Sequence, residues 1–180
     1  MTLTDAVLCD IETSRGTVVV RLLRPDDGEL LVDLVKRLSP ESLYYRFHVP
    51  IGTVSDPELY AQLPAYLDVD DRNHIAVVGT VAEEGRGETI IAVARFRRQN
   101  EGDRAEVAIV VRDDWQGLGI GKDMIAQTVE VARSVGIKTF IAWVHYANRT
   151  AQHLMAQLPY RLEHHPEHGE DYVLVHLGGT

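Results

Sequence analysis

The chain alternates between short runs of branched apolar residues and longer segments whose apolar residues recur at helical spacing. The short runs predict strands over Thr17–Leu23, His74–Val81, Thr89–Arg95, Ala105–Val111, Lys138–Val144 and Tyr172–Leu177. The longer segments predict amphipathic helices over Gly28–Leu38 and Ile120–Val135. Asn148 is a suitable N-cap for a further helix over Arg149–Gln157.

The segment between the first predicted helix and His74 has a weaker pattern. Ser39–Ser42 is predicted to open a turn or short helix, because Pro40 suits a first helical position. Pro50–Asn73 is predicted to be a loop with one short helix near Pro57–Leu63. Helices interleaved with consecutive strands favour an α/β fold of three layers, with a mixed sheet between helices.

Composition limits the class of protein. With 180 residues, 45% apolar and 25% charged, the chain suits one globular domain, expected over 17–180 after an N-terminal extension of residues 1–16. No apolar run is long enough to cross a membrane, and the acidic N-terminus does not resemble a signal peptide. Cys9 is the only cysteine, so no disulfide can form within the chain and the cytoplasm is the expected compartment.

The net charge of −9 bears on partners. It disfavours nucleic acid, which basic surfaces bind, and no membrane partner is expected. It suits a cationic acceptor such as a lysine or another amine, although acidity for solubility alone is the more common explanation of such a charge.

A glycine-rich loop, VVRDDWQGLGIGK over residues 110–122, joins a predicted strand to a predicted helix. The dinucleotide fingerprint fails there, since Lys122 stands where the third glycine belongs. The P-loop pattern fails too, since Gln116 replaces its first glycine and Asp123 its hydroxyl residue. A helix that starts near Gly119 would still direct free N–H groups and a positive dipole end at an anion.

A third pattern fits. Gln116, Gly119 and Gly121 match the [QR]-x-x-G-x-[GA] loop, so that the chain resembles the GNAT acyltransferase superfamily over about residues 17–177. LSPESLYYRF, residues 38–47, and Ala105–Val107 look like the catalytic domain of bacterial protein lysine acetyltransferases. The resemblance implies a three-layer fold with a mixed, mostly antiparallel sheet in which two central strands splay apart.

The resemblance also implies acetyl-CoA as cosubstrate, held without a metal. Its pyrophosphate would lie on the loop and its pantetheine arm along the end of the preceding strand, with Asn148 contacting the arm. The expected cofactor-binding residues are therefore Ile109, Val110, Val111, Gln116, Gly117, Leu118, Gly119, Ile120, Gly121, Lys122 and Asn148.

Glu106 is the candidate catalytic base. It is the only acid in the apolar run Ala105–Val111, where burial would raise a carboxyl pKa, and in the enzymes that the chain resembles a Glu in this context acts as base, through water. The alternative is a solvated Glu106 at the start of the strand, or one paired with Arg104 or Arg95.

The chain departs from the superfamily at the general acid. Met155 stands where many members have a Tyr that protonates the leaving thiolate. Tyr146, His145 or a water could serve instead, or the thiolate could leave unassisted.

Three further clusters have plain interpretations beside functional ones. His164, His165 and His168 fit a surface turn better than a metal site. Arg95, Arg97 and Arg98 fit a solvated strand end. Tyr44, Tyr45, Arg46 and Phe47 form either core or the acceptor wall that the superfamily builds at this point.

Together these features predict an N-acetyltransferase that moves acetyl from acetyl-CoA directly to an amine, with a protein lysine the favoured acceptor. Two alternatives stay open: a small-molecule amine or antibiotic N-acetyltransferase, and a non-catalytic domain that senses acetyl-CoA. The sequence leaves monomer and homodimer open.

Overall fold

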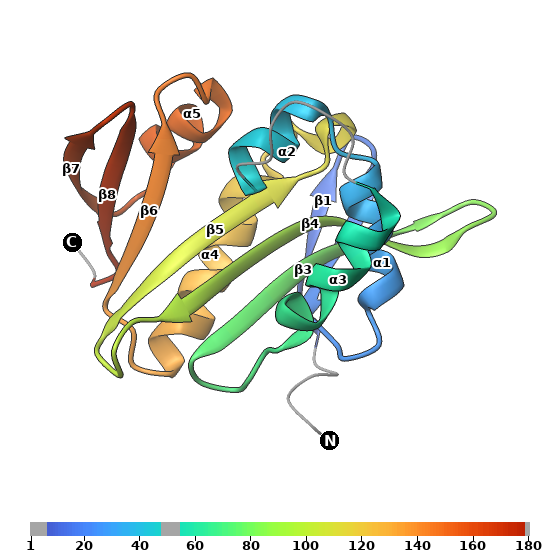
Figure 1. Cartoon of the computed structure of the whole chain (residues 1–180), viewed down its shortest axis with the longest axis horizontal. Helices are drawn as coiled ribbons and strands as arrows, with labels where there is room; N and C mark the ends of the chain where they lie inside the picture. Colours follow the sequence, from blue (N-terminus) through green and yellow to red (C-terminus); the bar gives the residue numbers. More distant parts are fainter. Residues whose placement is uncertain (1–6, 48–54, 179–180) are drawn as a thin grey trace.

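The computed structural model describes residues 7–47 and 55–178, which form one eight-stranded sheet flanked by helices (Figure 1). The strands are β1 (Val7–Thr13), β2 (Gly16–Leu22), β3 (His74–Glu83), β4 (Gly87–Arg98), β5 (Arg104–Val111), β6 (Thr139–His145), β7 (Arg161–Glu167) and β8 (Glu170–His176). The helices are α1 (Gly28–Lys36), α2 (Pro40–Phe47), α3 (Asp56–Leu67), the 3-10 turn η2 (Asp113–Trp115), α4 (Ile120–Ser134) and α5 (Arg149–Gln157).

The sheet has the order β1-β2-β3-β4-β5-β6-β8-β7 and is mixed, as predicted. Every neighbouring pair is antiparallel except β5 and β6, which α4 connects as a parallel crossover. This parallel pair is short: it joins Arg104 to Thr139, Ala105 to Phe140 and Glu106 to Ile141, and then ends. Beyond Glu106 the two strands diverge, which leaves the edge of β5 without a strand partner on that side (Figure 1).

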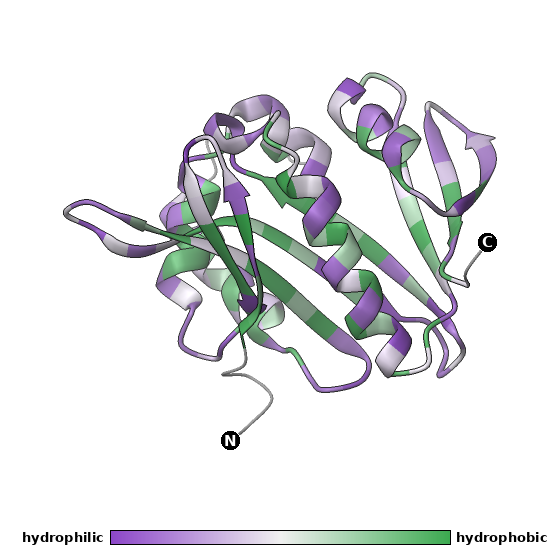
Figure 2. Cartoon of the chain, turned by 180° about the vertical axis from the view of Figure 1, so that it is seen from behind, coloured by the Kyte–Doolittle hydropathy of each residue, from purple (hydrophilic) through white to green (hydrophobic). Residues whose placement is uncertain are grey.

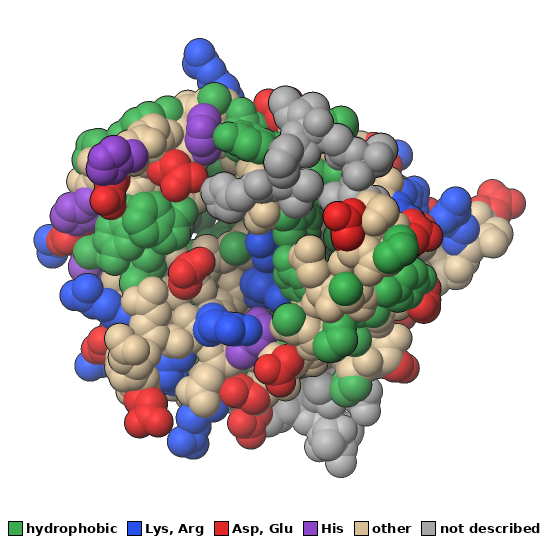
Figure 3. Space-filling view, in the orientation of Figure 1, with side chains coloured by type: hydrophobic (Ala, Val, Ile, Leu, Met, Phe, Trp, Pro, Cys, Tyr) green, Lys and Arg blue, Asp and Glu red, His purple; other side chains and the backbone are tan. Residues whose placement is uncertain are grey.

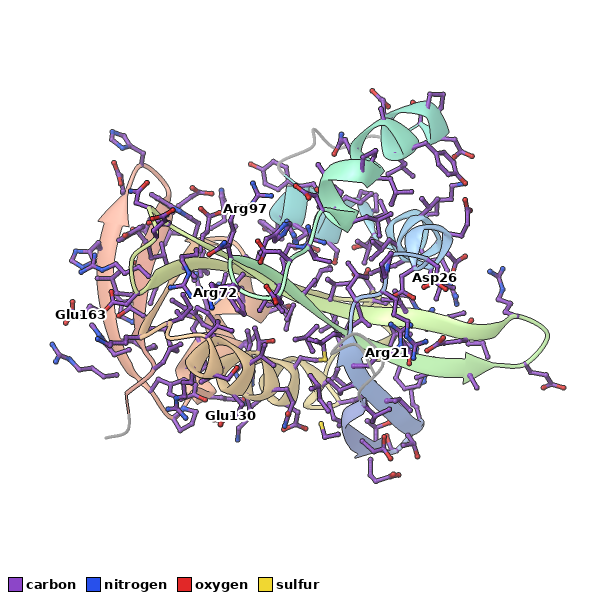
Figure 4. The ribbon with its side chains drawn as sticks, turned by 90° about the horizontal axis from the view of Figure 1, so that it is seen from below. Arg21, Asp26, Arg72, Arg97, Glu130 and Glu163 are labelled. Carbon is purple, nitrogen blue, oxygen red and sulfur yellow. The ribbon has the colours of Figure 1, made fainter. Side chains whose placement is uncertain are left out.

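Helices cover the two faces of the sheet unequally. Helix α4 packs on one face, where the apolar stripes of the strands run beneath it (Figure 2). Helices α1, α2 and α3 lie on the other face (Figure 4), where α1 buries Leu31 and Leu34 against Val78 and Val93 of the sheet. The strands β6, β8 and β7 form a separate wing with α5 beside it.

Three segments differ from the prediction. Residues 7–13, expected within an N-terminal extension, form strand β1 against β2, and residues 161–167, expected to include a surface turn, form strand β7 against β8. Both are edge strands: β7 has mostly exposed, polar side chains, and β1 buries Ile11 alone, so neither has the regular apolar alternation that marks a half-buried strand. The short helix expected near 57–63 is the longer α3; residues 48–54 of the predicted loop lie outside the described residues. No described helix combines the length and apolar character that crossing a membrane requires.

Candidate active site

A cleft of about 390 Å³ opens where β5 and β6 diverge, between α2, the start of α4 and α5. Most of the expected cofactor-binding residues line it: Ile109, Val110, Val111, Gln116, Gly117, Gly119, Ile120, Gly121, Lys122 and Asn148. Leu118 and Glu106 do not. The divergence of the strands therefore brings the glycine loop, the end of β5 and the cap of α5 to one hollow.

The glycine loop has the backbone that a bound anion needs. Gly117 and Gly119 have φ of 74° and 82°, and a Cβ added at either would meet nothing within 4 Å. Gly119 caps α4, so the first N–H groups of the helix have no carbonyl partner within it. Gly121 differs: it is helical, and a Cβ there would make an ordinary van der Waals contact with Leu154 at 3.5 Å. The loop fits a pyrophosphate without a metal.

Two of the residues expected to bind the coenzyme have side chains that are hydrogen-bonded to the protein's own backbone. The Gln116 amide donates to the Val111 carbonyl at 2.9 Å and closes the turn after β5. The Asn148 side chain accepts from the Ala151 amide at 3.0 Å and caps α5. These bonds shape the cleft wall; contact with a coenzyme stays a prediction for both residues.

A network of charged side chains that the sequence did not reveal surrounds Arg112, which lies between β5 and the glycine loop. Arg112, 2% exposed, donates to Glu83 at 2.6 Å and to Asp114 at 2.6 Å, and Glu83 also accepts from Arg37 at 2.8 Å. The hydrogen bonds from Arg37, followed by those from Arg112, lower the pKa of Glu83 to about 2 although burial opposes the shift. An arginine directly after an apolar run was the available signal, because a buried cation requires partners.

Helix α2 is tied to the same loop. The Asp113 carboxylate accepts from the backbone amide of Ser39 at 2.9 Å, from the Ser39 hydroxyl at 2.7 Å and from the Ser42 hydroxyl at 2.8 Å. Because Ser42 and Tyr45 line the cleft, these bonds fix one wall of the cleft relative to its anion loop.

Glu106 lies beyond the cleft, at the point where β5 and β6 separate. Its side chain is exposed, so the expectation of a carboxyl buried within the strand was wrong. The reason is local: Arg104 and Glu106 lie at the start of the strand, where alternate side chains are exposed. The pairing that would make Glu106 merely structural is also absent, since within residues 7–47 and 55–178 it forms no ion pair with Arg104 or Arg95.

The candidates for the general acid differ in whether they line the cleft. Met155 packs against the core beneath α4, and neither Tyr146 nor His145 lines the cleft. The His145 Nδ1 accepts from the Ala147 amide at 3.0 Å. Tyr45 on α2, which the sequence placed in a possible acceptor wall, does line the cleft and packs on the His145 ring at 5.5 Å.

The histidine and arginine clusters noted in the sequence lie outside the cleft. His164 and His165 are successive residues of β7 and so point to opposite faces, with His164 bonded to Asp171 and His165 packed on Tyr172. Among the described residues no three such side chains are grouped as a metal site. Arg95 is half-buried on the face of α1–α3, so placing it at a solvated strand end was wrong.

Known proteins share this arrangement. Residues 40–158 match the acetyltransferase (GNAT) family. The chain is 30% identical to an acetyltransferase of Pseudomonas aeruginosa over 83% of this chain and 78% of that protein. It is 34% identical to the acetyltransferase Pat of Mycolicibacterium smegmatis over 77% of this chain, although it spans 40% of Pat.

A solved structure is similar as well. The GNAT domain of S. lividans PAT superposes with a TM-score of 0.77 and 27% identity, covering 92% of this chain and 94% of that domain. The family match covers more than half of the chain, and the splayed β5–β6 pair and the glycine loop lie within it. This chain therefore belongs to the acetyltransferase (GNAT) family, whose members transfer an acyl group from acetyl-CoA.

Proposed function

We propose that the protein acetylates the side-chain amine of a lysine in a protein, with acetyl-CoA as donor and no covalent enzyme intermediate. One observation carries the proposal: at the two ends of the free edge of β5 stand a glycine loop that opens a helix and an exposed carboxylate that forms no ion pair in the described part of the chain. Glu106 and Val110 are four residues apart, roughly 13 Å along the strand. That separation leaves room for an acyl group and an amine between them.

The residues would divide the work as follows. Backbone N–H groups at Gly117–Gly121 hold the pyrophosphate, and the free edge of Ile109–Val111 binds the pantetheine arm as an added strand would. Glu106 takes a proton from the acceptor ammonium, through a water. The amine nitrogen then bonds to the acyl carbon as the carbon–sulfur bond breaks, and the departing thiolate takes a proton from Tyr45.

Tyr45 is our choice of acid because it is the phenol that the described cleft presents. Tyr146 is 47% exposed outside the cleft, and Met155 cannot donate a proton. Proton donation by Tyr45 should raise the rate only modestly, because thiol pKa values near 8.5 make a thiolate a tolerable leaving group.

The protein-lysine acceptor rests on the likeness of LSPESLYYRF and Ala105–Val107 to protein lysine acetyltransferases, and on the net charge of −9. The direct test is calorimetry with acetyl-CoA followed by a thiol-release assay with lysine peptides and small amines. Binding without thiol release on any acceptor would favour the sensing domain, and release with small amines alone would favour the small-molecule enzyme.

A further inference from the structure

Two arginines meet on the sheet face that holds Glu106, and neither forms an ion pair within residues 7–47 and 55–178. Burial lowers the pKa of Arg46, and the charges of Tyr66 and Glu106 oppose that shift, so the nearest influence of a carboxylate on Arg46 comes from the candidate base itself. Arg46 comes from α2 and Arg95 from β4, and both line a cavity of about 60 Å³ beneath α1 and α3. Arg46 also lines the large cleft, so it stands between the two hollows. Figure 3 shows blue atoms of basic side chains in the hollowed middle of this face.

The two guanidinium groups are held by rings. Arg46 stacks on Phe47 with its Cζ 4.8 Å from the ring centroid, and Arg95 stacks on Tyr66 at 4.6 Å. The two rings in turn pack edge to face at 5.8 Å. Such stacking fixes the planes of both guanidinium groups, which is the state in which an arginine recognises a carboxylate with least loss of freedom.

Most of their hydrogen-bonding capacity is unused. Arg95 donates from Nη2 to the Tyr66 carbonyl at 3.2 Å, but its buried Nε has no partner. Arg46 makes no hydrogen bond and no ion pair in the described part of the chain, and residues 48–54, HVPIGTV, contain no acid. Burial, followed by the nearby Arg46, lowers the pKa of Arg95 to about 10. Half-buried cations without partners are costly, so the site favours a bound anion.

The positions of Arg46 and Arg95 relative to Glu106 indicate which anion they would bind. On β4, Arg95 and Arg97 point to the same face, and Arg97 is paired with Glu106 and Arg95 with Ala108. Arg95 therefore stands one step from the candidate base, toward Val110, which lines both hollows. An acceptor whose amine faces Glu106 would place its neighbouring group at the arginines.

We propose that Arg46 and Arg95 bind a carboxylate that the acceptor carries close to its reacting amine. This rests on the transfer of acetyl to an amine in the proposed function, whether the amine is in a peptide or in a small molecule, and narrows the acceptor to one that carries a carboxylate near that amine. The cavity of about 60 Å³ holds roughly four water-sized groups. Leucine and valine side chains form most of its wall, so the carboxylate belongs at the end that Arg46 and Arg95 line, with its apolar stem toward the rest of the cavity. The carboxylate can be that of a free amino acid or of an acidic residue beside a lysine in a peptide.

Matched acceptor pairs test this. In one arm Nα-acetyllysine is compared with its carboxamide, and in the other the capped dipeptide Glu-Lys is compared with capped Gln-Lys. Charge-assisted bonds lead us to expect at least a 10-fold higher kcat/KM for the charged member in one arm. Arg46→Gln and Arg95→Gln should each reduce that preference below about 3-fold, and Arg95→Lys should restore part of it.

A readout without turnover keeps the two proposals apart. Calorimetry with the CoA complex gives the Kd of each acceptor, and the same preference should appear there. Carboxylate preference in binding without thiol release would leave the anion site standing and remove the acetyltransfer. Equal Kd values for charged and neutral members in both arms would overturn the anion site.

Two controls complete the test. Arg86→Gln makes the same change of net charge at the distant β3–β4 turn, where Arg86 pairs with Asp33, and should leave the preference unchanged. If instead Arg46→Gln and Arg95→Gln impair turnover with succinyl-CoA and spare acetyl-CoA, the arginines serve the donor and the acceptor assignment fails.

Discussion

Glu106 on β5 lies directly opposite Arg97 on β4, in the last rows before the edge of β5 loses its second partner. Cross-strand partners share a face, so both side chains point to the side that carries α1–α3, where Figure 4 shows Arg97. Val107 and Ile109 instead pack toward α4. The proposed base therefore shares its face with the two arginines, which is the face where we propose that the acceptor binds.

Replacing Glu106 should separate chemistry from coenzyme binding. Glu106→Gln keeps the shape and removes the base, so we expect kcat to fall by about 10²-fold or more with an unchanged Kd for acetyl-CoA. Steady-state kinetics and calorimetry measure the two quantities. Glu84→Gln, an exposed acid of the β3–β4 hairpin, is the matched control. A Glu106→Gln enzyme with wild-type kcat would remove Glu106 from the mechanism.

Enlarging the loop glycine should block the coenzyme. A side chain at Gly119 would project into the open space over the loop, so Gly119→Trp should weaken acetyl-CoA binding by more than about 100-fold. Gly85 is the matched control: its φ is 73°, a Cβ there also meets nothing, and it lies in the β3–β4 turn. Gly85→Trp therefore carries the same backbone strain without the cleft. Similar acetyl-CoA affinities for the two variants would contradict the proposed cradle.

Tyr45 and Tyr146 can be compared as proton donors. Tyr45 lines the cleft and Tyr146 does not, so Tyr45→Phe should lower kcat by about 10-fold while Tyr146→Phe leaves it within 2-fold. Acetyl-CoA affinity should be unchanged in both, which calorimetry checks. The opposite order of effects would return the acid to Tyr146, and two unaffected variants would mean that the thiolate leaves without help from either phenol.

The sequence predicted the parts of the fold that have strong hydrophobic periodicity. Val18, Val77 and Ile91 are fully buried branched residues within predicted strands, and Met124 and Val129 mark the buried stripe of α4. The strands at both edges of the sheet were not predicted, because β7 is mostly exposed and β1 buries only Ile11, so neither carries a regular pattern. Local periodicity therefore predicts what is buried, and edge strands depend on a partner that pattern alone does not name.

The candidate site likewise has features that the sequence predicted and features that it did not. The glycine loop was recognised because its function resides in a contiguous backbone stretch. The exposure of Glu106, the Arg112–Glu83 network and the Arg46–Arg95 pair all depend on residues far apart in the chain. Arg46 on α2 and Arg95 on β4, for example, are separated by a helix and a strand, and only the folded sheet places them beside one cavity.

The ion network behind the loop should make stability depend on acid pH. The pKa is 4.5 for an ordinary glutamate and about 2 for Glu83 in the folded protein. The stability that the Glu83 carboxylate contributes is therefore complete above about pH 4.5 and is lost as the pH falls toward 2. A shift of that size corresponds to about 3 kcal/mol at neutral pH. Glu83→Gln should therefore lower the free energy of unfolding by about 2–3 kcal/mol at pH 7, measured by urea titration, and by much less at pH 2.5. Asp103→Asn, whose partner Lys138 is 77% exposed, should change it by under about 1 kcal/mol at either pH. A Glu83→Gln deficit that stays constant between pH 7 and pH 2.5 would show that packing, and not the charge of Glu83, stabilises the loop.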